Sequence, residues 1–330
     1  MTGTLQVATT GTVSGLANNQ QINAVAAALA TANQGAAAPT TATTGLGATA
    51  GLFWHDTVNN LLLLRNQADS AWICLAAVDE TNGRLVFSEP NFLSGLTLSN
   101  DATSPNTVID IAPGAAMDSG NAQPMILPSA VTKTIGGVFV AGSGNAGLDS
   151  GSVAANTWYH LHLIWGPGKT TDVLLSTSPA APTMPSGYTL HRRIGSIKTD
   201  GSSHMMAFSQ NGDEFLWATP PQDFGPTTCS TSAALTTLST PFGVKTNALI
   251  TAVLSSVTAT TGTYISSTDV SNISAFPSNY TVLATGTDNG QGFSSVRTST
   301  SSQVRTISTA TSANLTIGTL GWIDLRGKLG

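Results

Sequence analysis

Residues 157–165 have the pattern of a β-strand, in which successive side chains point to opposite faces. Two histidines lie two positions apart within this stretch. His160 and His162 therefore share one strand face, an arrangement that metal sites use, and His191 or His204 could supply a third ligand. The same face also carries a tryptophan and an isoleucine, which favours packed, hydrogen-bonded imidazoles. We expect no metal and no other cofactor, and His160 and His162 are the residues to inspect.

Paired carboxylates could hydrolyse a glycosidic bond. Two acidic pairs are adjacent in the chain, Asp79 with Glu80 and Asp213 with Glu214. Neighbouring residues of a strand point to opposite faces, so neither pair can flank one bond. The other acidic residues of interest stand alone in turn-like contexts: Glu89, Asp110, Asp118 and Asp223. We expect a protein that is not an enzyme, and a glycan hydrolase is the least favoured alternative.

Sugar binding requires aromatic rings for stacking and amide or hydroxyl groups to fix the orientation. Tyr264, Tyr280 and Phe293 lie among many Asn, Ser and Thr residues in the last third of the chain. The alternative is that these rings belong to a hydrophobic core. Tyr264, Tyr280 and Phe293 are our candidate glycan-binding residues.

The two cysteines, Cys74 and Cys229, are too few for a disulfide framework and lack the spacing of metal ligands. Unpaired cysteine is among the most buried residue types. We therefore expect two buried thiols.

The chain of 330 residues is 41% hydrophobic and only 9% charged, with a formal net charge of -5. A typical globular chain carries about 25% charged residues, so this surface must be rich in hydroxyl and amide groups. Because repulsion between charges is weak, we expect copies of the chain to cover part of the surface. The acidic balance provides no basic field for a phosphate backbone, which argues against nucleic acid as a partner.

Residues 1–15 lack a charged segment followed by an apolar core, so they do not form a secretory signal. No uncharged apolar run approaches the ~20 residues of a membrane helix. We expect the chain to be made in the cytoplasm and not to insert into a membrane.

The stretch 158–217 organises the chain, because its first strand is apolar or aromatic on both faces and must be covered on both sides. The short links to the next strands require antiparallel hairpins. The strands expected here cover residues 157–165, 172–176, 192–197 and 205–217.

Residues 1–35 form an arm and one helix, predicted over residues 16–33 by apolar residues at three- and four-residue steps. We expect this segment to serve attachment or oligomerisation. Residues 36–77 form a linker and a small β-meander, with strands at 52–55, 61–65 and 71–75, in which Trp54 and Trp72 face each other.

Turn residues then recur every eight to twelve positions, a spacing typical of β-sandwiches and jelly rolls. Two prolines after residue 219 mark a boundary. The expected fold is mainly β, with an N-terminal arm and helix, a small β-meander, and two antiparallel sandwich or jelly-roll-like domains. These two domains are placed at residues 78–224 and 225–330.

Four stretches resemble the tail-fibre and tail proteins of tailed bacteriophages. They are GLFWHDTVNNLLLLRNQADSAWICL at 51–75, DVLLSTSPAAPTMPSGYTLHRRIGSIKTDG at 172–201, AFSQNGDEFLW at 207–217 and LGWIDLRGKLG at 320–330. A looser likeness covers FLSGLTLSNDATSPNTVIDIAPGAAMDSGN. The resemblance implies a virion tail protein and does not reach residues 1–50.

Two functions follow from this resemblance. The first is a structural virion component, a homotrimeric tail fibre or tail-tip subunit that attaches to the tail by its N-terminus. The second is a carbohydrate-binding adhesin that touches the host surface. The partners implied are copies of the chain, other tail or baseplate proteins, and host surface polysaccharide. The expected location is the virion tail, after assembly in the host cytoplasm.

Overall fold

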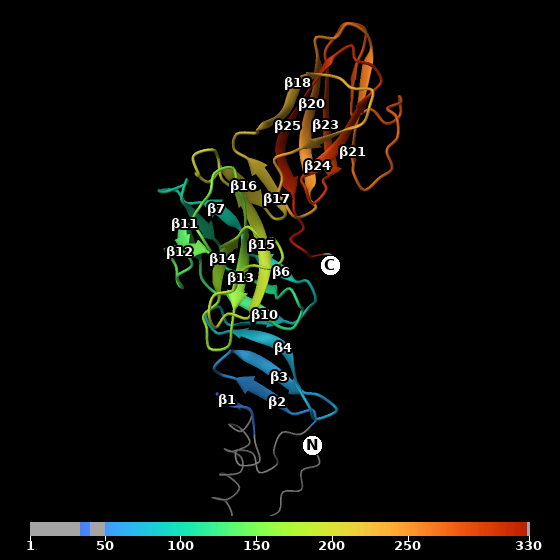
Figure 1. Ribbon diagram of the computed structural model, residues 1–330. Helices are drawn as coiled ribbons and strands as arrows, with labels where there is room; N and C mark the ends of the chain where they lie inside the picture. Colours follow the sequence, from blue (N-terminus) through green and yellow to red (C-terminus); the bar gives the residue numbers. More distant parts are fainter. Residues whose placement is uncertain (1–33, 40–49, 329–330) are drawn as a thin grey trace, which may run out of the picture. The chain divides into compact units, whose positions relative to one another are not determined.

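A computed structural model describes residues 34–39 and 50–328, and the chain divides into two compact units, Met1–Phe87 and Ser88–Gly330 (Figure 1). All regular secondary structure in the described ranges is β, which confirms the mainly β fold class. The helix predicted at 16–33 lies outside the described residues. In the ranges described, no helix has the length and apolar character needed to cross a bilayer.

The first unit contains one five-stranded sheet, built from β1 (Gln34–Gly35), β2 (Phe53–Asp56), β3 (Leu61–Arg65), β4 (Trp72–Asp79) and β5 (Arg84–Phe87) in that order. The expected contact between Trp54 and Trp72 is confirmed, since their ring centroids lie 5.4 Å apart. The sheet also continues beyond the predicted boundary at residue 77, because β4 runs on to Asp79 and pairs with β5.

The polar turns of this sheet form as the sequence indicates. The carboxylate of Asp56 accepts hydrogen bonds from the backbone amides of Val58 and Asn59, at 3.0 and 3.1 Å. The side-chain oxygen of Asn66 accepts the amide of Ser70 at 2.9 Å. Short side chains that bond their own backbone fix the two reversals of the chain.

The central element of the second unit is β13 (Trp158–Trp165), which lies inside a seven-stranded sheet. Every residue of β13 after Trp158 is buried, so the predicted cover on both faces is confirmed. The strand order is β15 (Leu190–Lys198), β13, β14 (Asp172–Ser176), β12 (Asn145–Leu148), β11 (Val131–Val138), β8 (Val108–Ile111) and β7 (Leu98–Asn100).

The expectation of purely antiparallel pairing is wrong for this sheet. β13 does pair antiparallel with β14 and β15, but β12 runs parallel to both β11 and β14. Residues 139–144 join β11 to β12, and β13 lies between β12 and β14 in the sequence, so neither parallel pair is connected through a helix. A second, three-stranded sheet has the order β10 (Pro124–Leu127), β9 (Gly114–Met117), β6 (Leu93–Gly95).

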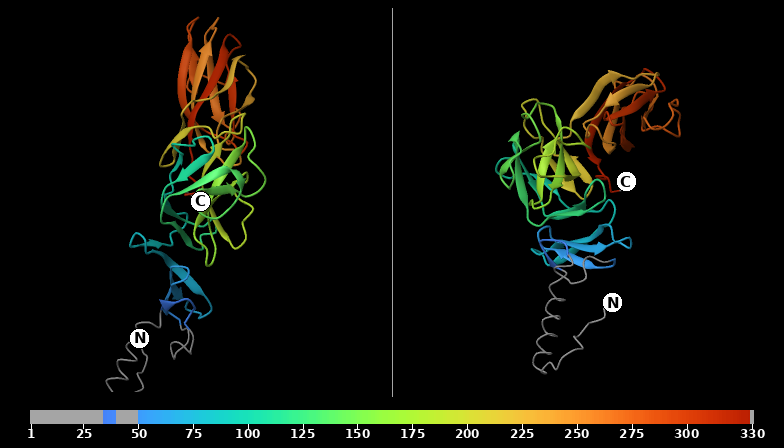
Figure 2. Two further views of the ribbon diagram at one scale, coloured as in Figure 1. Left: turned by 90° about the vertical axis from the view of Figure 1, so that its left-hand side faces the viewer. Right: turned by 60° about the horizontal axis from the view of Figure 1, so that its bottom comes forward.

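The remaining strands form two sheets, visible as adjacent layers in Figures 1 and 2, and a second core lies between them. One contains β16 (Phe208–Asn211), β17 (Glu214–Trp217), β25 (Asn314–Ile323), β20 (Asn247–Ser255) and β23 (Gly290–Arg297), with β18 (Gln222–Thr228) also paired to β25. The other contains β19 (Ala234–Thr237), β24 (Gln303–Ser308), β21 (Thr261–Ser267) and β22 (Val282–Ala284). Four residues of the first of these sheets belong instead to the core of the seven-stranded sheet: Phe208, Phe215, Trp217 and Trp322.

The last strand, β25, pairs with strands on both sides of the predicted domain boundary at residue 224. β25 pairs with β20 and β18 after the boundary and also with β17 before it. Its residues alternate between buried and half-buried positions over most of its length. The end of the chain is therefore integral to the larger, preceding part of the second unit.

Candidate functional site

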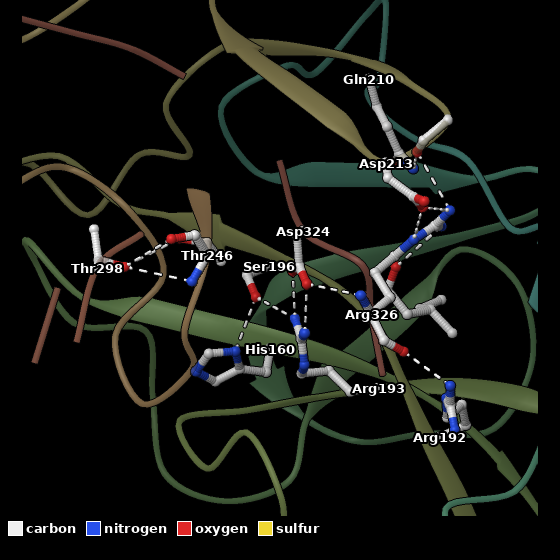
Figure 3. Close-up of polar contacts among 12 residues, drawn as sticks. His160, Arg192, Arg193, Ser196, Gln210, Asp213, Thr246, Thr298, Asp324 and Arg326 are labelled. Atoms are coloured by element: carbon white, nitrogen blue, oxygen red, sulfur yellow. Dashed lines mark hydrogen bonds and ion pairs between the residues drawn. The ribbon is translucent and has the colours of Figure 1, made fainter. Parts of the chain in front are cut away.

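A cluster of charged side chains is buried where β15, the β16–β17 turn and the end of β25 meet (Figure 3). Arg193 donates two hydrogen bonds to the carboxylate of Asp324, both at 2.7 Å. Such fork-to-fork pairs are the strongest kind of side-chain ion pair. Burial alone would raise the pKa of Asp324, but Arg193 outweighs it and holds the pKa below the usual value.

Arg326 extends this ion cluster. Its guanidinium lies 2.8 Å from the carboxylate of Asp213, and its backbone amide donates to Asp324 at 2.9 Å. Its carbonyl accepts a hydrogen bond from Arg192 at 3.0 Å. Arg326 is 3% exposed and adopts the left-handed backbone conformation, with φ of 53°. The surrounding contacts hold a conformation that costs about 1 kcal/mol in isolation.

The cluster leaves no acid or base available for catalysis. Asp213, one of the acidic residues considered from the sequence, is occupied by Arg326 and by Lys328 at 2.8 Å. Burial opposes the ionised form of Asp213, and the two cations lower its pKa in spite of this. What the arrangement can do is fasten residues 324–328 to β15 and to the β16–β17 turn.

His160 connects this cluster to the face of β13. Its Nδ1 lies 2.9 Å from the hydroxyl of Ser196, and that hydroxyl also accepts a hydrogen bond from Arg193 at 3.2 Å. A serine beside a histidine is the arrangement of a nucleophile and its base. Ser196 is fully buried and already bound to a guanidinium, so it is held as a structural hydroxyl. Burial first, and then the charge of Arg193, lowers the pKa of His160 to about 4.

His162 is buried on the same face, and its Nε2 lies 3.0 Å from the carbonyl oxygen of Ser178. Burial lowers the pKa of His162 to about 3. His191 packs against it edge-on at 5.5 Å between ring centroids, whereas His204 lies beside Asp200. Across the part of the chain that is described, no three His, Cys or acidic side chains are grouped to hold a metal ion.

A pocket of about 490 Å³ opens beside His160. Trp158, Leu238 and Phe242 provide apolar surface, and polar groups surround them. The polar residues of the lining are Asn156, Thr157, His160, Thr177, Lys198, Thr237 and Ser302. The pocket therefore combines aromatic rings with hydroxyl and amide groups, as sites for small polar molecules do.

Lys198 supplies the positive charge of this pocket. Its ammonium group donates to the hydroxyl of Ser239 at 3.2 Å and lies 5.9 Å from the centre of the Trp158 ring. Burial lowers the pKa of Lys198, and the nearby carboxylate of Asp223 partly opposes this effect. An ammonium group has three donors, so one hydrogen bond leaves capacity for a ligand.

No family model matches this chain, and no curated protein is detectably similar to it. The geometry of the side chains is therefore the basis for assigning a role to the cluster and to the pocket.

The three aromatic residues chosen from the sequence do not form one site. Tyr264 on β21 is half-buried, and the ring of Tyr280 covers Gly262, two residues away on the same strand face. Phe293 is 64% exposed on β23, which belongs to the other sheet. All three rings point away from the core that the two sheets share, so Phe293 lies on the face opposite the two tyrosines.

Sequence reasoning missed both the ion cluster and the pocket. Arg192, Arg193 and Lys198 lie close together in the sequence, but in the structure Arg192 is buried, the other two are half-buried, and each has its own partner. The sequence does contain a signal for the ion cluster. Charged residues are scarce in this chain, and a charged residue inside an apolar strand needs a partner of opposite charge. A second buried pair, Lys133 with Asp172 at 2.9 Å, shows the same feature.

The two cysteines take no part in these sites. Cys229 is buried in the core between the last two sheets, as expected. Cys74 is only half-buried, which corrects the prediction for that residue. Neither sulfur belongs to a disulfide.

Proposed function

We propose that this chain is a structural component of a bacteriophage virion, a tail fibre or tail-tip subunit that is not an enzyme. One observation carries the proposal. Three of the stretches that resemble tail proteins, 172–201, 207–217 and 320–330, each contribute to the ion cluster. Arg193 comes from the first, Asp213 from the second, and Asp324 with Arg326 from the third.

The residues behind the resemblance thus serve to hold a shape. They join segments that are more than one hundred positions apart in the chain, and both carboxylates of the cluster are paired with guanidinium groups. A protein whose distinctive residues fasten its own framework suits a mechanical role better than a catalytic one. In this proposal the second unit contains two sandwich-like domains, residues 1–35 attach to the tail, and copies associate as a homotrimer.

Purified tailed particles test the proposal. Antibodies against the second unit should label intact particles, and peptides of this chain should appear among the particle proteins in a fixed ratio to known tail subunits. A particle preparation that lacks the chain, while the producing cells contain it, would overturn the assignment.

A second function is favoured by the pocket beside His160. Trp158 and Phe242 offer ring faces, Lys198 a charge, and the threonines, asparagine and serine around them offer hydrogen bonds. We propose that this pocket binds a sugar residue of a host surface polysaccharide, in place of the site predicted at Tyr264, Tyr280 and Phe293. The volume of about 490 Å³ accommodates one or two sugar rings.

Calorimetry with fragments of bacterial surface polysaccharides tests this second function. Phe242→Ala and Lys198→Met should each weaken binding at least tenfold, since one removes a ring that is 57% exposed and the other removes the charge. Phe293→Ala is the matched control, because it removes an equally exposed ring outside the pocket. Binding that is lost in the control and kept in the pocket variants would return the site to the outer face of β23.

A further inference from the structure

One face of the five-stranded sheet in the first unit is apolar and open to solvent. The pairing register places Phe53, Leu64 and Ile73 in one row across β2, β3 and β4. The same register places Val78 opposite Leu85, and Ala76 opposite Phe87, on that side of the sheet. Four of these side chains are strongly exposed: Phe53 at 52%, Ile73 at 48%, Leu85 at 45% and Phe87 at 60%. We call this surface, made of Phe53, Leu62, Leu64, Ile73, Val78, Leu85 and Phe87, the open face.

The opposite face of the sheet is covered and carries the charges. Trp54, Leu61, Leu63 and Val86 are all less than 9% exposed on that side. The charged residues of the strands share it: Asp56, Arg65, Asp79 and Arg84. The carboxylate of Asp79 also accepts a hydrogen bond from the guanidinium of Arg84 at 2.9 Å.

The open face carries no ionic group. Its polar neighbours in the described strands are Gln34 and His55, which the register places opposite each other, and the Nε2 of His55 is buried without a hydrogen bond within the described residues. A surface without charge can select neither an acidic nor a basic partner. It is complementary to another apolar, uncharged and gently twisted sheet face, and the open face itself has these properties.

The exposed area is sufficient for such a contact. A large side chain offers roughly 150–250 Å² when fully exposed, so the four strongly exposed residues present roughly 400 Å². With the half-buried Leu62, Leu64 and Val78, two copies would bury roughly 1,000 Å² between them. That is the lower bound for a specific interface.

We infer that the open face of the first unit packs against the open face of a second copy of this chain. One surface that meets itself makes a two-fold contact, so it pairs two copies and is separate from the threefold association in the proposed function. The inference therefore goes beyond that function. Sheets packed this way lie about 10 Å apart with their side chains interdigitated. The contact brings the first units of two copies together and leaves the second units outside it.

Two variants of the full-length chain, which carry opposite charges at the same position, test the contact. Ile73→Lys and Ile73→Glu each place a charge on the open face, and each should halve the mass in solution, because the two-fold contact is lost while any threefold association remains. An equimolar mixture of the two variants should regain the oligomer, because opposite charges then meet across the contact. Sedimentation velocity measures all three samples.

Two controls separate loss of contact from loss of fold. Ile73→Val keeps an apolar surface and should keep the oligomer. Phe293→Lys places a charge on an equally exposed ring in the second unit and should not change the mass. Near-ultraviolet circular dichroism from the Trp54 and Trp72 pair reports whether the sheet of each variant is folded.

Three outcomes would overturn the inference: a wild-type chain that is monomeric, charged variants that keep the wild-type mass, or a mixture of the two variants that fails to recover the wild-type mass. The last outcome would indicate that the open face binds a different surface. None of these results bears on whether particles contain the chain, so failure here is distinguishable from failure of the proposed function.

Discussion

At the scale of single residues, Asp324 is the more deeply buried of the two carboxylates in the ion cluster. Asp324→Asn leaves the guanidinium of Arg193 buried without its carboxylate, and removal of one partner from a buried pair costs about 3–5 kcal/mol of unfolding free energy. Denaturant unfolding followed by tryptophan fluorescence measures the change. Asp269→Asn is the matched control, because Asp269 pairs with the exposed side chains of Lys245 and Arg297. Equal losses in the two variants would contradict the role given to the cluster.

The buried histidines predict how stability depends on pH. His160 and His162 have folded-state pKa values of about 4 and about 3, whereas an unperturbed histidine has a pKa of 6.5. The unfolded chain therefore binds more protons than the folded chain below pH 6.5, and stability falls as the pH falls from 6.5 towards 4. At pH 5 each histidine costs about 2 kcal/mol relative to pH 7.

Thermal unfolding between pH 4 and 7 measures this dependence. His162→Asn should flatten the slope by about half, whatever its effect on stability at pH 7. A His162→Asn variant with the wild-type slope would show that His162 does not take up a proton on unfolding.

At the scale of elements, β25 is the strand on which the second unit depends, because it pairs with β17, β18 and β20. Gly321 lies where β25 meets β17, and a β-carbon there would stand 2.9 Å from the Cα of Leu216 and closer still to the carbonyl of Phe215. Gly321→Ala should lower the unfolding free energy by about 1–3 kcal/mol, because the two strands must move apart.

Gly136→Ala is the control for this prediction. Gly136 is exposed on β11, and an added β-carbon there meets no atom within 4 Å. Its stability should stay within about 0.5 kcal/mol of the wild type. If Gly321→Ala proves as harmless as the control, the β17–β25 pairing is less tight than described.

The sequence predicted these elements well where the pattern is local. The alternation of Tyr159, Leu161 and Leu163 located β13, and the polar turns located β2 to β4. Pairing between distant strands left no such signal: nothing near Leu148 indicates that β12 runs parallel to its neighbours. Arg193 and Asp324 are likewise 131 positions apart, so their ion pair could not be predicted from spacing.

The candidate sites were predicted less well than the fold, for a related reason. A pocket depends on which loops meet in space, and Phe242 joins Trp158 only after the strands between them are paired. Tyr264 and Phe293 were chosen by composition, which does not indicate which of two sheets a residue belongs to. A site built from several loops becomes predictable only once the strand order is known.

At the scale of the whole molecule, the hydrophobic cores of the second unit are formed by residues between Leu93 and Trp322. A fragment of residues 88–330 should therefore fold alone and unfold cooperatively within about 3 °C of the same transition in the full chain. Differential scanning calorimetry of both proteins measures this. A fragment that shows no transition would mean that the second unit requires residues 1–87.

The central claim is that this chain is a fixed part of a virion tail, built to hold a shape. Electron microscopy of purified tailed particles, with gold-labelled antibodies against residues 1–50 and against residues 225–330, tests it most directly. The account predicts that both labels lie on the tail, with the first label nearer to the tail body than the second. Particles that carry neither label, although the chain is abundant in the cells that release them, would contradict it.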